Sequence, residues 1–397
     1  MRNPLSDIIV DIPPSGIRKF FDVVSEMKGA ISLGVGEPDF DTPWHVREEG
    51  IYSLENGRTF YKSNAGLKEL KQEIGKYLKR RMHIDYDYNT EILVTVGGSE
   101  AIDIALRAML NPGEEVLIPQ PSYVSYVPCA VLAGGKPVII ELEEKDQFKL
   151  TKEKLLEKIT PNTKVLILPF PNNPTGAIME REDLEEIAKV IEEKDIFVIS
   201  DELYAELTYK GEHVSIAAIP GMRERTVLIN GFSKAYAMTG WRIGYTAASK
   251  ELTRAMIALQ GHITSHPSTV SQWAGVEALK HCGDNTSMMA AAYRERMEAA
   301  VAFLREELPQ ISFIEPKGAF YLFLDISSLK DCFGEREQPY STAFTMKLLN
   351  EKHVAVAPGA AFGMDGFIRI AYAADKDTLL RGLGRIRDLV KELRREW

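Results

Sequence analysis

The chain has 397 residues, of which 45% are hydrophobic and 26% are charged. This length exceeds what one hydrophobic core usually serves, so we expect two domains, and the composition is ordinary for a globular protein. The 48 Lys and Arg residues against 57 Asp and Glu residues leave a net charge of −9. That balance, and the lack of a basic run interleaved with aromatic residues, argues against nucleic acid as the main partner.

The cysteines and the N-terminal stretch bear on cellular location. Cys129, Cys282 and Cys332 are odd in number and widely spaced, so we expect neither a metal site nor a disulfide framework, and a cytoplasmic setting. The first residues carry acidic side chains and prolines where a signal peptide has an apolar stretch. No apolar run reaches the roughly 18 residues of a membrane span, so no membrane partner is expected.

Between about residues 67 and 259, short apolar runs alternate with helical patterns. The predicted strands are 92–96, 116–118, 138–141, 164–169, 196–200, 226–230 and 242–247. Leu67, Leu70 and Ile74 share one face of a helix, a second helix follows Gly98 with Ser99 as its N-cap, and a third covers 181–194. Apolar strands separated by helices predict an α/β fold whose mostly parallel sheet is flanked by helices.

The pattern changes near residue 287. A long helical pattern at 288–308 precedes apolar stretches at 320–326, 354–356 and 367–373, a helix after Ser341 and a charged C-terminal helix. These elements predict a smaller α+β domain at 287–397 beside a larger domain at 46–286. We expect the proline-containing segment 1–45 to pack with the smaller domain.

Lys234 directly follows an apolar strand, in Asn230-Gly-Phe-Ser-Lys234-Ala-Tyr. Burial disfavours an ammonium ion and lowers its pKa, which is what Schiff-base chemistry needs. A lysine that extends from a loop into water is the alternative, and this stretch alone favours that alternative.

Three further stretches place polar groups after strands. Gly97-Gly98-Ser99-Glu100 opens a helix and forms either a phosphate cradle or an ordinary turn. The segment Pro169-Phe-Pro-Asn-Asn173-Pro-Thr-Gly is a turn motif. Asp201 ends a buried strand, where a carboxylate needs a partner unless it caps the next segment.

Together and in this order, these stretches resemble the motifs of class I and II aminotransferases, which are pyridoxal-phosphate enzymes of fold type I. The resemblance runs from about Ser32 to Tyr372, and segments 15–21 and 40–43 look most like the aromatic, aspartate and diaminopimelate subgroup. It implies pyridoxal 5′-phosphate held as a Schiff base on Lys234. It also implies an amino-acid-metabolism enzyme that moves the amino group of an L-amino acid to a 2-oxo acid by a ping-pong mechanism.

The resemblance implies a role for each matching residue around the cofactor. Asp201 pairs with the pyridine nitrogen and keeps the ring an electron sink. Asn173 and Tyr204 donate hydrogen bonds to the phenolic oxygen. The remaining cofactor contacts are Gly98, Ser99, the Glu100 backbone amide and Arg242 at the phosphate, and Tyr123 stacked on the ring. From sequence alone, Tyr123 reads equally well as a core tyrosine.

Substrate binding is implied for Gly36, Asn173 and Arg369, with Arg369 a bidentate clamp on the α-carboxylate. Tyr61 matches a tyrosine that reaches the phosphate of the neighbouring subunit, which implies a homodimer with shared active sites. One departure concerns the phosphate: some members carry a serine where this chain has Gly231, and Ser233 is the candidate replacement.

Three other classes of protein share some of these features. A Rossmann dehydrogenase is disfavoured because Gly34-Val-Gly36 continues without a third glycine. A transcription regulator built on this fold needs a DNA-binding module, and only about 30 residues precede Ser32. A carbon–sulfur β-lyase shares the fold and stays open, because the motifs define the cofactor and not the bond broken.

The substrate side chain is the least defined part of the site. Alignment places Gly261 where animal-type aspartate aminotransferases use an arginine for an acidic side chain, so that mode of recognition is not expected. Ile17, Phe20 and Tyr61 either line an apolar side-chain pocket or, for the first two, pack the N-terminal segment.

Overall fold

A computed structural model of the chain describes residues 2–10, 12, 27, 29–334 and 338–395. The expectations for segment 15–21, including Ile17 and Phe20, lie outside these residues. The helices are α1 (Asp7–Val10), α3 (Trp44–Glu55), α4 (Lys68–Tyr77), α5 (Gly97–Met109), α6 (Tyr126–Leu132), α7 (Lys152–Lys158), α8 (Arg181–Lys194), α9 (Lys250–Ile263), α10 (Thr269–His281), α11 (Gly283–Glu307), α12 (Tyr340–Lys352) and α13 (Lys376–Arg395).

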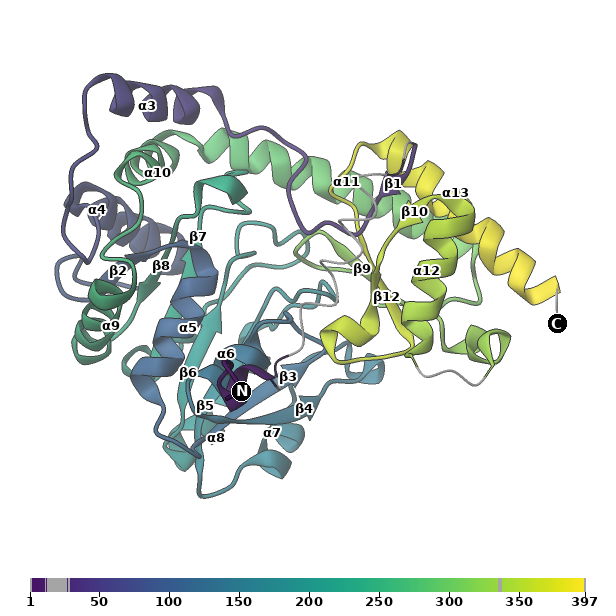
Figure 1. Cartoon of the computed structure of the whole chain (residues 1–397), viewed down its shortest axis with the longest axis horizontal. Coiled ribbons are helices and arrows are strands. Elements are labelled where there is room, and N and C mark those ends of the chain that lie inside the picture. The colour runs from purple at the N-terminus through teal and green to yellow at the C-terminus, as the bar shows by residue number, and fades with distance from the viewer. Residues whose placement is uncertain (1, 11, 13–26, 28, 335–337, 396–397) are drawn as a thin grey trace.

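The larger sheet has seven strands in the order β2-β8-β7-β6-β5-β3-β4 (Figure 1). They are β2 (Ile92–Thr95), β3 (Glu115–Gln120), β4 (Lys136–Glu141), β5 (Thr163–Leu168), β6 (Phe197–Asp201), β7 (Thr226–Gly231) and β8 (Gly244–Ala247). β4, β3, β5, β6 and β7 pair in parallel, whereas β8 is antiparallel to both β7 and β2. The prediction of a mostly parallel sheet is therefore confirmed.

Both faces of this sheet are buried. Along β5, Val165 and Ile167 pack in one hydrophobic cluster with α5, α6 and α9, while Leu166 and Leu168 pack in another with α8. Side chains of a strand alternate between faces, so a strand covered on both sides is apolar at every position. The continuous apolar runs of the sequence have this origin.

The smaller lobe holds a three-stranded antiparallel sheet in the order β11-β12-β9 and the helices α11, α12 and α13 (Figure 1). Its strands are β9 (Tyr321–Asp325), β11 (Ala357–Pro358) and β12 (Phe367–Ala371). A separate parallel pair joins β1 (Ile31–Ser32) to β10 (Val354–Ala355). A segment near the N-terminus thus pairs with the part of the chain that follows α12.

Several expected boundaries differ from the structure, and three of the differences have a clear physical reason. Ser99 is not the N-cap of its helix: α5 begins two residues earlier, at Gly97, with Val96 as the cap residue. Gly97 has φ +74°, a conformation that glycine adopts without strain, and this lets the turn close earlier. The last strand of the large sheet begins at Gly244 instead of residue 242, because Arg242 has φ +55° after a 3₁₀ turn. α11 begins at Gly283 instead of residue 288. Its first turn is polar, so the apolar periodicity of the sequence does not reveal it.

The carboxyl ends of the parallel strands meet at one edge of the large sheet. β6 ends at Asp201, β7 leads to Lys234, and β5 leads to Asn173. β2 runs in the same direction and leads into the N-terminus of α5. In open α/β sheets this edge is where ligands bind.

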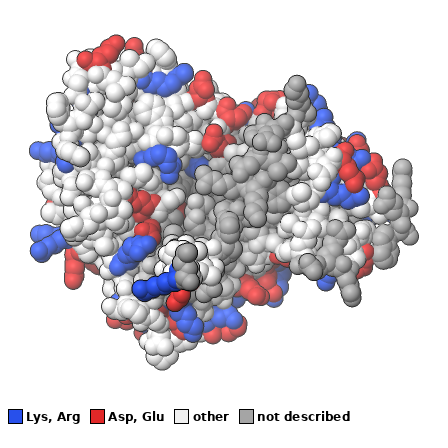
Figure 2. Space-filling view, in the orientation of Figure 1, with Lys and Arg blue, Asp and Glu red and all other residues white. Residues whose placement is uncertain are grey.

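The described surface shows no dominant charge on the face in Figure 2, where Lys and Arg atoms are interspersed with Asp and Glu atoms. Within the described ranges, no helix combines the length and the apolar character needed to cross a bilayer.

Candidate active site

A cavity of about 750 Å³ opens at the carboxyl edge of the large sheet, facing the smaller lobe. It is lined by most of the residues that the sequence singled out: Gly36, Gly98, Ser99, Tyr123, Asn173, Asp201, Tyr204, Ser233, Lys234, Arg242 and Arg369. Glu100 and Tyr61 are the two that do not line it. The structure therefore brings together residues separated by more than 300 positions.

Lys234 presents its amine to this cavity. Burial, reinforced by the positive charge of Arg369, lowers the pKa of Lys234 to about 8. The amine donates a hydrogen bond to the Gly36 carbonyl at 2.5 Å. A substantial fraction of this amine is therefore neutral near pH 8, as a nucleophilic lysine requires.

Asp201 is the buried last residue of β6. Its carboxylate accepts a hydrogen bond from the Tyr126 hydroxyl at 2.7 Å and one from the Leu203 amide at 3.3 Å. Burial raises the pKa of Asp201, and these two hydrogen bonds oppose that rise. Neither donor carries a charge, so a cationic N–H in the cavity is the partner that the buried carboxylate favours.

Tyr126 is a part of the site that sequence reasoning missed. It is the buried first residue of α6, and its ring meets that of Tyr123 edge-on at 5.6 Å. Its spacing of three from Tyr123 is the one sequence pattern that distinguishes Tyr126 from the other tyrosines.

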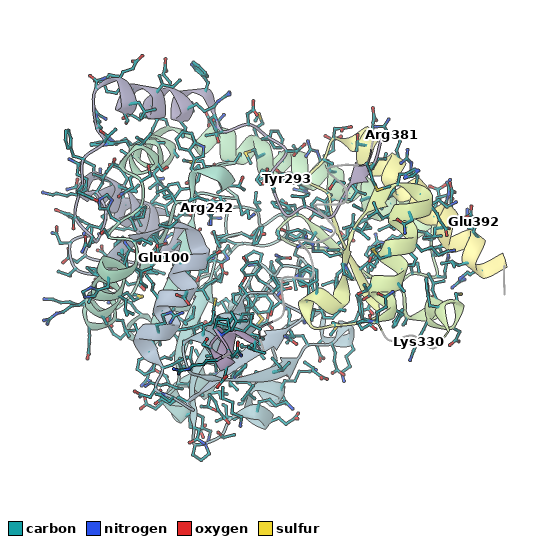
Figure 3. The ribbon with its side chains drawn as sticks, in the orientation of Figure 1. Glu100, Arg242, Tyr293, Lys330, Arg381 and Glu392 are labelled. Carbon is teal, nitrogen blue, oxygen red and sulfur yellow. The ribbon has the colours of Figure 1, made fainter. Side chains whose placement is uncertain are left out.

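The opposite end of the cavity is built to hold an anion. The first amides of α5 have no intrahelical acceptor, and the helix dipole is positive there. Glycine permits close packing at this turn: a Cβ on Gly98 would lie 2.6 Å from a methyl group of Leu203, and one on Gly97 would lie 2.7 Å from the guanidinium of Arg242. The Arg242 guanidinium therefore lies directly beside the helix start, as Figure 3 also indicates.

Glu100 stabilises this turn without entering the cavity. Its carboxylate accepts from the Val96 amide and from the Thr264 hydroxyl, the latter at 2.8 Å. At Gly231, a Cβ would lie 3.1 Å from the backbone of Gly244. A serine at that position, as some family members carry, would lie in tight contact with the neighbouring strand.

The third part of the site lies on β12. Arg369 is buried and donates to the side-chain oxygen of Asn173 at 2.8 Å and to the Gly34 carbonyl. Its Nε has no partner among the described residues. Burial lowers the pKa of Arg369, and neither of its acceptors carries a charge. A buried cation in this condition is a binding site for an anion.

Tyr61 lies away from the cavity and is 89% exposed, with its ring against His266 at 5.8 Å. Other large hydrophobic side chains in the same part of the chain are also exposed, among them Trp44, Leu54 and Phe60. Grouped exposed side chains of this kind mark interaction surfaces. Among the described residues, no group of His, Cys, Asp and Glu is placed to hold a metal ion.

Comparisons with known proteins identify the family. The family model described as aminotransferase class I and II matches residues 28–386, and the chain belongs to this family. It is 41% identical to the aspartate aminotransferase of Pyrococcus abyssi and 40% identical to aromatic-amino-acid aminotransferase 2 of Thermococcus litoralis, in each case over 98% of both chains. The aspartate aminotransferase structure from Thermus thermophilus with maleate is 35% identical, with a TM-score of 0.91, and the match covers 98% of this chain and 100% of that one.

The chain is therefore a pyridoxal-phosphate-dependent aminotransferase of fold type I. The relatives named here are aminotransferases, so they support transamination over the carbon–sulfur lyase alternative. The cavity fits the cofactor: it offers a neutralisable amine, a buried carboxylate without a charged partner and an anion-binding helix start.

Proposed function

We propose that this cavity transfers the amino group of an L-amino acid to a 2-oxo acid, with Lys234 as the residue that carries pyridoxal 5′-phosphate. The observation that supports this most directly is the meeting of the Lys234 amine with the buried Asp201 and Arg369 in one cavity. Asp201 would hold the pyridine nitrogen, and Asn173 and Tyr204 the phenolic oxygen. Gly98, Ser99, Ser233, Arg242 and the Glu100 amide would hold the phosphate, with Tyr123 stacked on the ring.

When bound, the cofactor supplies an electron sink for the negative charge that develops at the substrate Cα. Arg369 and Gly36 orient the substrate through its α-carboxylate, together with Asn173. Lys234 Nζ, as a neutral amine, removes the proton from Cα and later returns a proton as an ammonium. The lowered pKa of Lys234 suits both directions, because a group with a pKa near 8 is both an adequate base and an adequate acid.

Single-turnover absorbance tests this function. Adding an L-amino acid to the loaded enzyme, with no 2-oxo acid present, should remove the visible absorbance and release one equivalent of 2-oxo acid. Adding 2-oxoglutarate should then restore the absorbance. Aspartate and phenylalanine should be compared as donors, because relatives named for each are equally similar to this chain. The proposal would be contradicted if ammonia were released and the 2-oxo acid did not restore the visible absorbance.

The lowered pKa of Lys234 predicts how cofactor attachment depends on pH. Only the neutral amine attacks the cofactor aldehyde, so the attachment rate should rise about tenfold per pH unit at low pH. It should level off above pH 8, where Lys234 is deprotonated. Stopped-flow absorbance of the cofactor-free protein mixed with pyridoxal phosphate measures this rate. A rate still rising at pH 10 would contradict the burial argument.

We also propose a cytoplasmic homodimer with shared active sites and a role in amino-acid biosynthesis. The dimer is supported by the exposed Tyr61 and its exposed apolar neighbours, which a partner subunit would cover. The cytoplasmic setting is supported by the three unpaired cysteines. We place the domain boundaries near residues 45 and 286, because one hydrophobic cluster joins Ile31 and Leu33 to α11, α12 and α13.

Mixed dimers test whether Tyr61 acts in the neighbouring site. Tyr61→Ala should lower kcat/KM by roughly tenfold to a hundredfold, the loss of one hydrogen bond to a charged group. Lys234→Ala subunits should be inactive. If the site is shared, a reassembled equal mixture contains heterodimers with one intact site each, and activity should recover to about a quarter of the wild-type value. If the mixture is no more active than the Tyr61→Ala enzyme diluted to the same concentration, Tyr61 acts within its own subunit.

A further inference from the structure

Tyr321 links two parts of the site and was not among the residues expected from sequence. It is the first residue of β9, is fully buried and lines the cavity. Its hydroxyl lies 2.8 Å from the hydroxyl of Tyr204. Its ring centroid lies 4.4 Å from the Arg369 guanidinium carbon. One side chain therefore contacts both the proposed phenolic-oxygen donor and the proposed carboxylate clamp.

The direction of the hydrogen bond between the two phenols follows from their proton count. Burial raises the pKa of both Tyr204 and Tyr321, so each keeps its single proton. If Tyr204 gives its proton to the phenolic oxygen of the cofactor, it can only accept from Tyr321. Hydrogen bonds in such a chain polarise one another, so donation by Tyr321 makes Tyr204 the stronger donor.

The ring of Tyr321 has a separate role. The Arg369 guanidinium lies over this ring and also over that of Phe362, whose centroid is 4.7 Å away. Two aromatic faces stabilise a buried cation and restrict its plane. The Tyr321 hydroxyl is also seated against the backbone at position 36, where a Cβ would overlap it. Gly36 is thus required for the ring to occupy this position.

We propose that Tyr321 is a positioning residue with two separable parts. Its hydroxyl donates to Tyr204 and directs that phenol's proton toward the cofactor, and its ring holds the Arg369 guanidinium in the plane that receives the substrate carboxylate. This inference rests on the functions proposed above for Tyr204 and Arg369.

Tyr321→Phe tests the hydroxyl and keeps the ring. Loss of the donor leaves the negative phenolic oxygen less stabilised, which favours the protonated form of the nitrogen that joins Lys234 to the cofactor. The pH midpoint of the visible absorbance should therefore rise by roughly half a pH unit. The dissociation constant for a substrate analogue should change less than about twofold, because the ring remains beside Arg369.

Tyr321→Leu removes the ring as well. The probe is the 2-methyl derivative of the better donor, 2-methylaspartate or 2-methylphenylalanine, which lacks the Cα proton and binds without completing turnover. Its dissociation constant, from absorbance titration, should rise roughly fivefold to tenfold, the contribution expected of a buried cation–π contact. If Tyr321→Leu does not fold, Tyr321→Met replaces it, because the longer and more flexible methionine side chain adapts better to the space of the ring.

Tyr372→Phe is the matched control. Tyr372 is buried in the same hydrophobic cluster, its hydroxyl approaches the Ala319 carbonyl at 3.4 Å, and it does not line the cavity. A midpoint for Tyr321→Phe equal to that of the control would overturn the role of the hydroxyl. Unchanged analogue binding in the Leu or Met variant would overturn the role of the ring. A wild-type enzyme without any Lys234-dependent visible band would instead refute the proposed function, and this inference with it.

Discussion

Lys234→Ala should lower kcat by roughly 10⁴-fold or more, the largest effect expected of any substitution in this chain. The variant loses both the covalent attachment of the cofactor and the amine that moves the Cα proton, and each contributes orders of magnitude to the rate. When pyridoxal phosphate is added to this variant, the absorbance of the cofactor should not shift, because no amine in the cavity reacts with its aldehyde. Steady-state kinetics and an absorbance titration measure the two losses independently.

Lys71→Met is a matched control for this experiment. Lys71 is also a buried lysine whose pKa is lowered by burial, but it lies on α4 and donates to the Asn89 carbonyl, away from the cavity. This variant should keep the visible band and turnover near the wild-type value. Full turnover in Lys234→Ala would show that another group attaches the cofactor.

The predictable part of the fold is the part built from local patterns. The bounds of α8, residues 181–194, were predicted correctly, because an amphipathic period coincides there with a capping box. The parallel strands were located to within a few residues, because burial on both faces makes them apolar at every position. The start of α5 was predicted wrongly, because Gly97 adopts a positive φ that no side-chain pattern reports.

The site was predictable where its residues belong to contiguous motifs. Asp201 ends a strand, Lys234 and Asn173 follow strands, and the order of the motifs placed the three residues together. Tyr126 and Tyr321 escaped prediction because their roles come from contacts across the chain, 75 residues from Asp201 in one case and 117 residues from Tyr204 in the other. Such contacts depend on the strand order and on the closeness of the two lobes, which no local pattern contains.

Asp201→Ala should lower kcat/KM by about 10³-fold, because removing one partner of a buried charge pair costs about 4 kcal/mol. Without the carboxylate, the cavity no longer favours a protonated pyridine nitrogen, and charge at the substrate Cα is less stabilised. Asp201→Asn keeps the size and the contact with Tyr126 while removing the charge, so it should lose nearly as much activity. Steady-state kinetics at saturating cofactor measures both variants.

The neighbouring carboxylate is the control for position. Glu202 is equally buried, but it accepts from Ser200, Ser215 and His213 and does not line the cavity. Glu202→Gln should therefore lower thermal stability without a comparable loss of kcat/KM. Tyr126→Phe removes one of the two hydrogen bonds to Asp201 and should fall between these limits, with a loss of about tenfold. If Glu202→Gln lost as much kcat/KM as Asp201→Asn in a protein that stays folded, the loss would not be specific to Asp201, and the assignment of the ring nitrogen to Asp201 would be wrong.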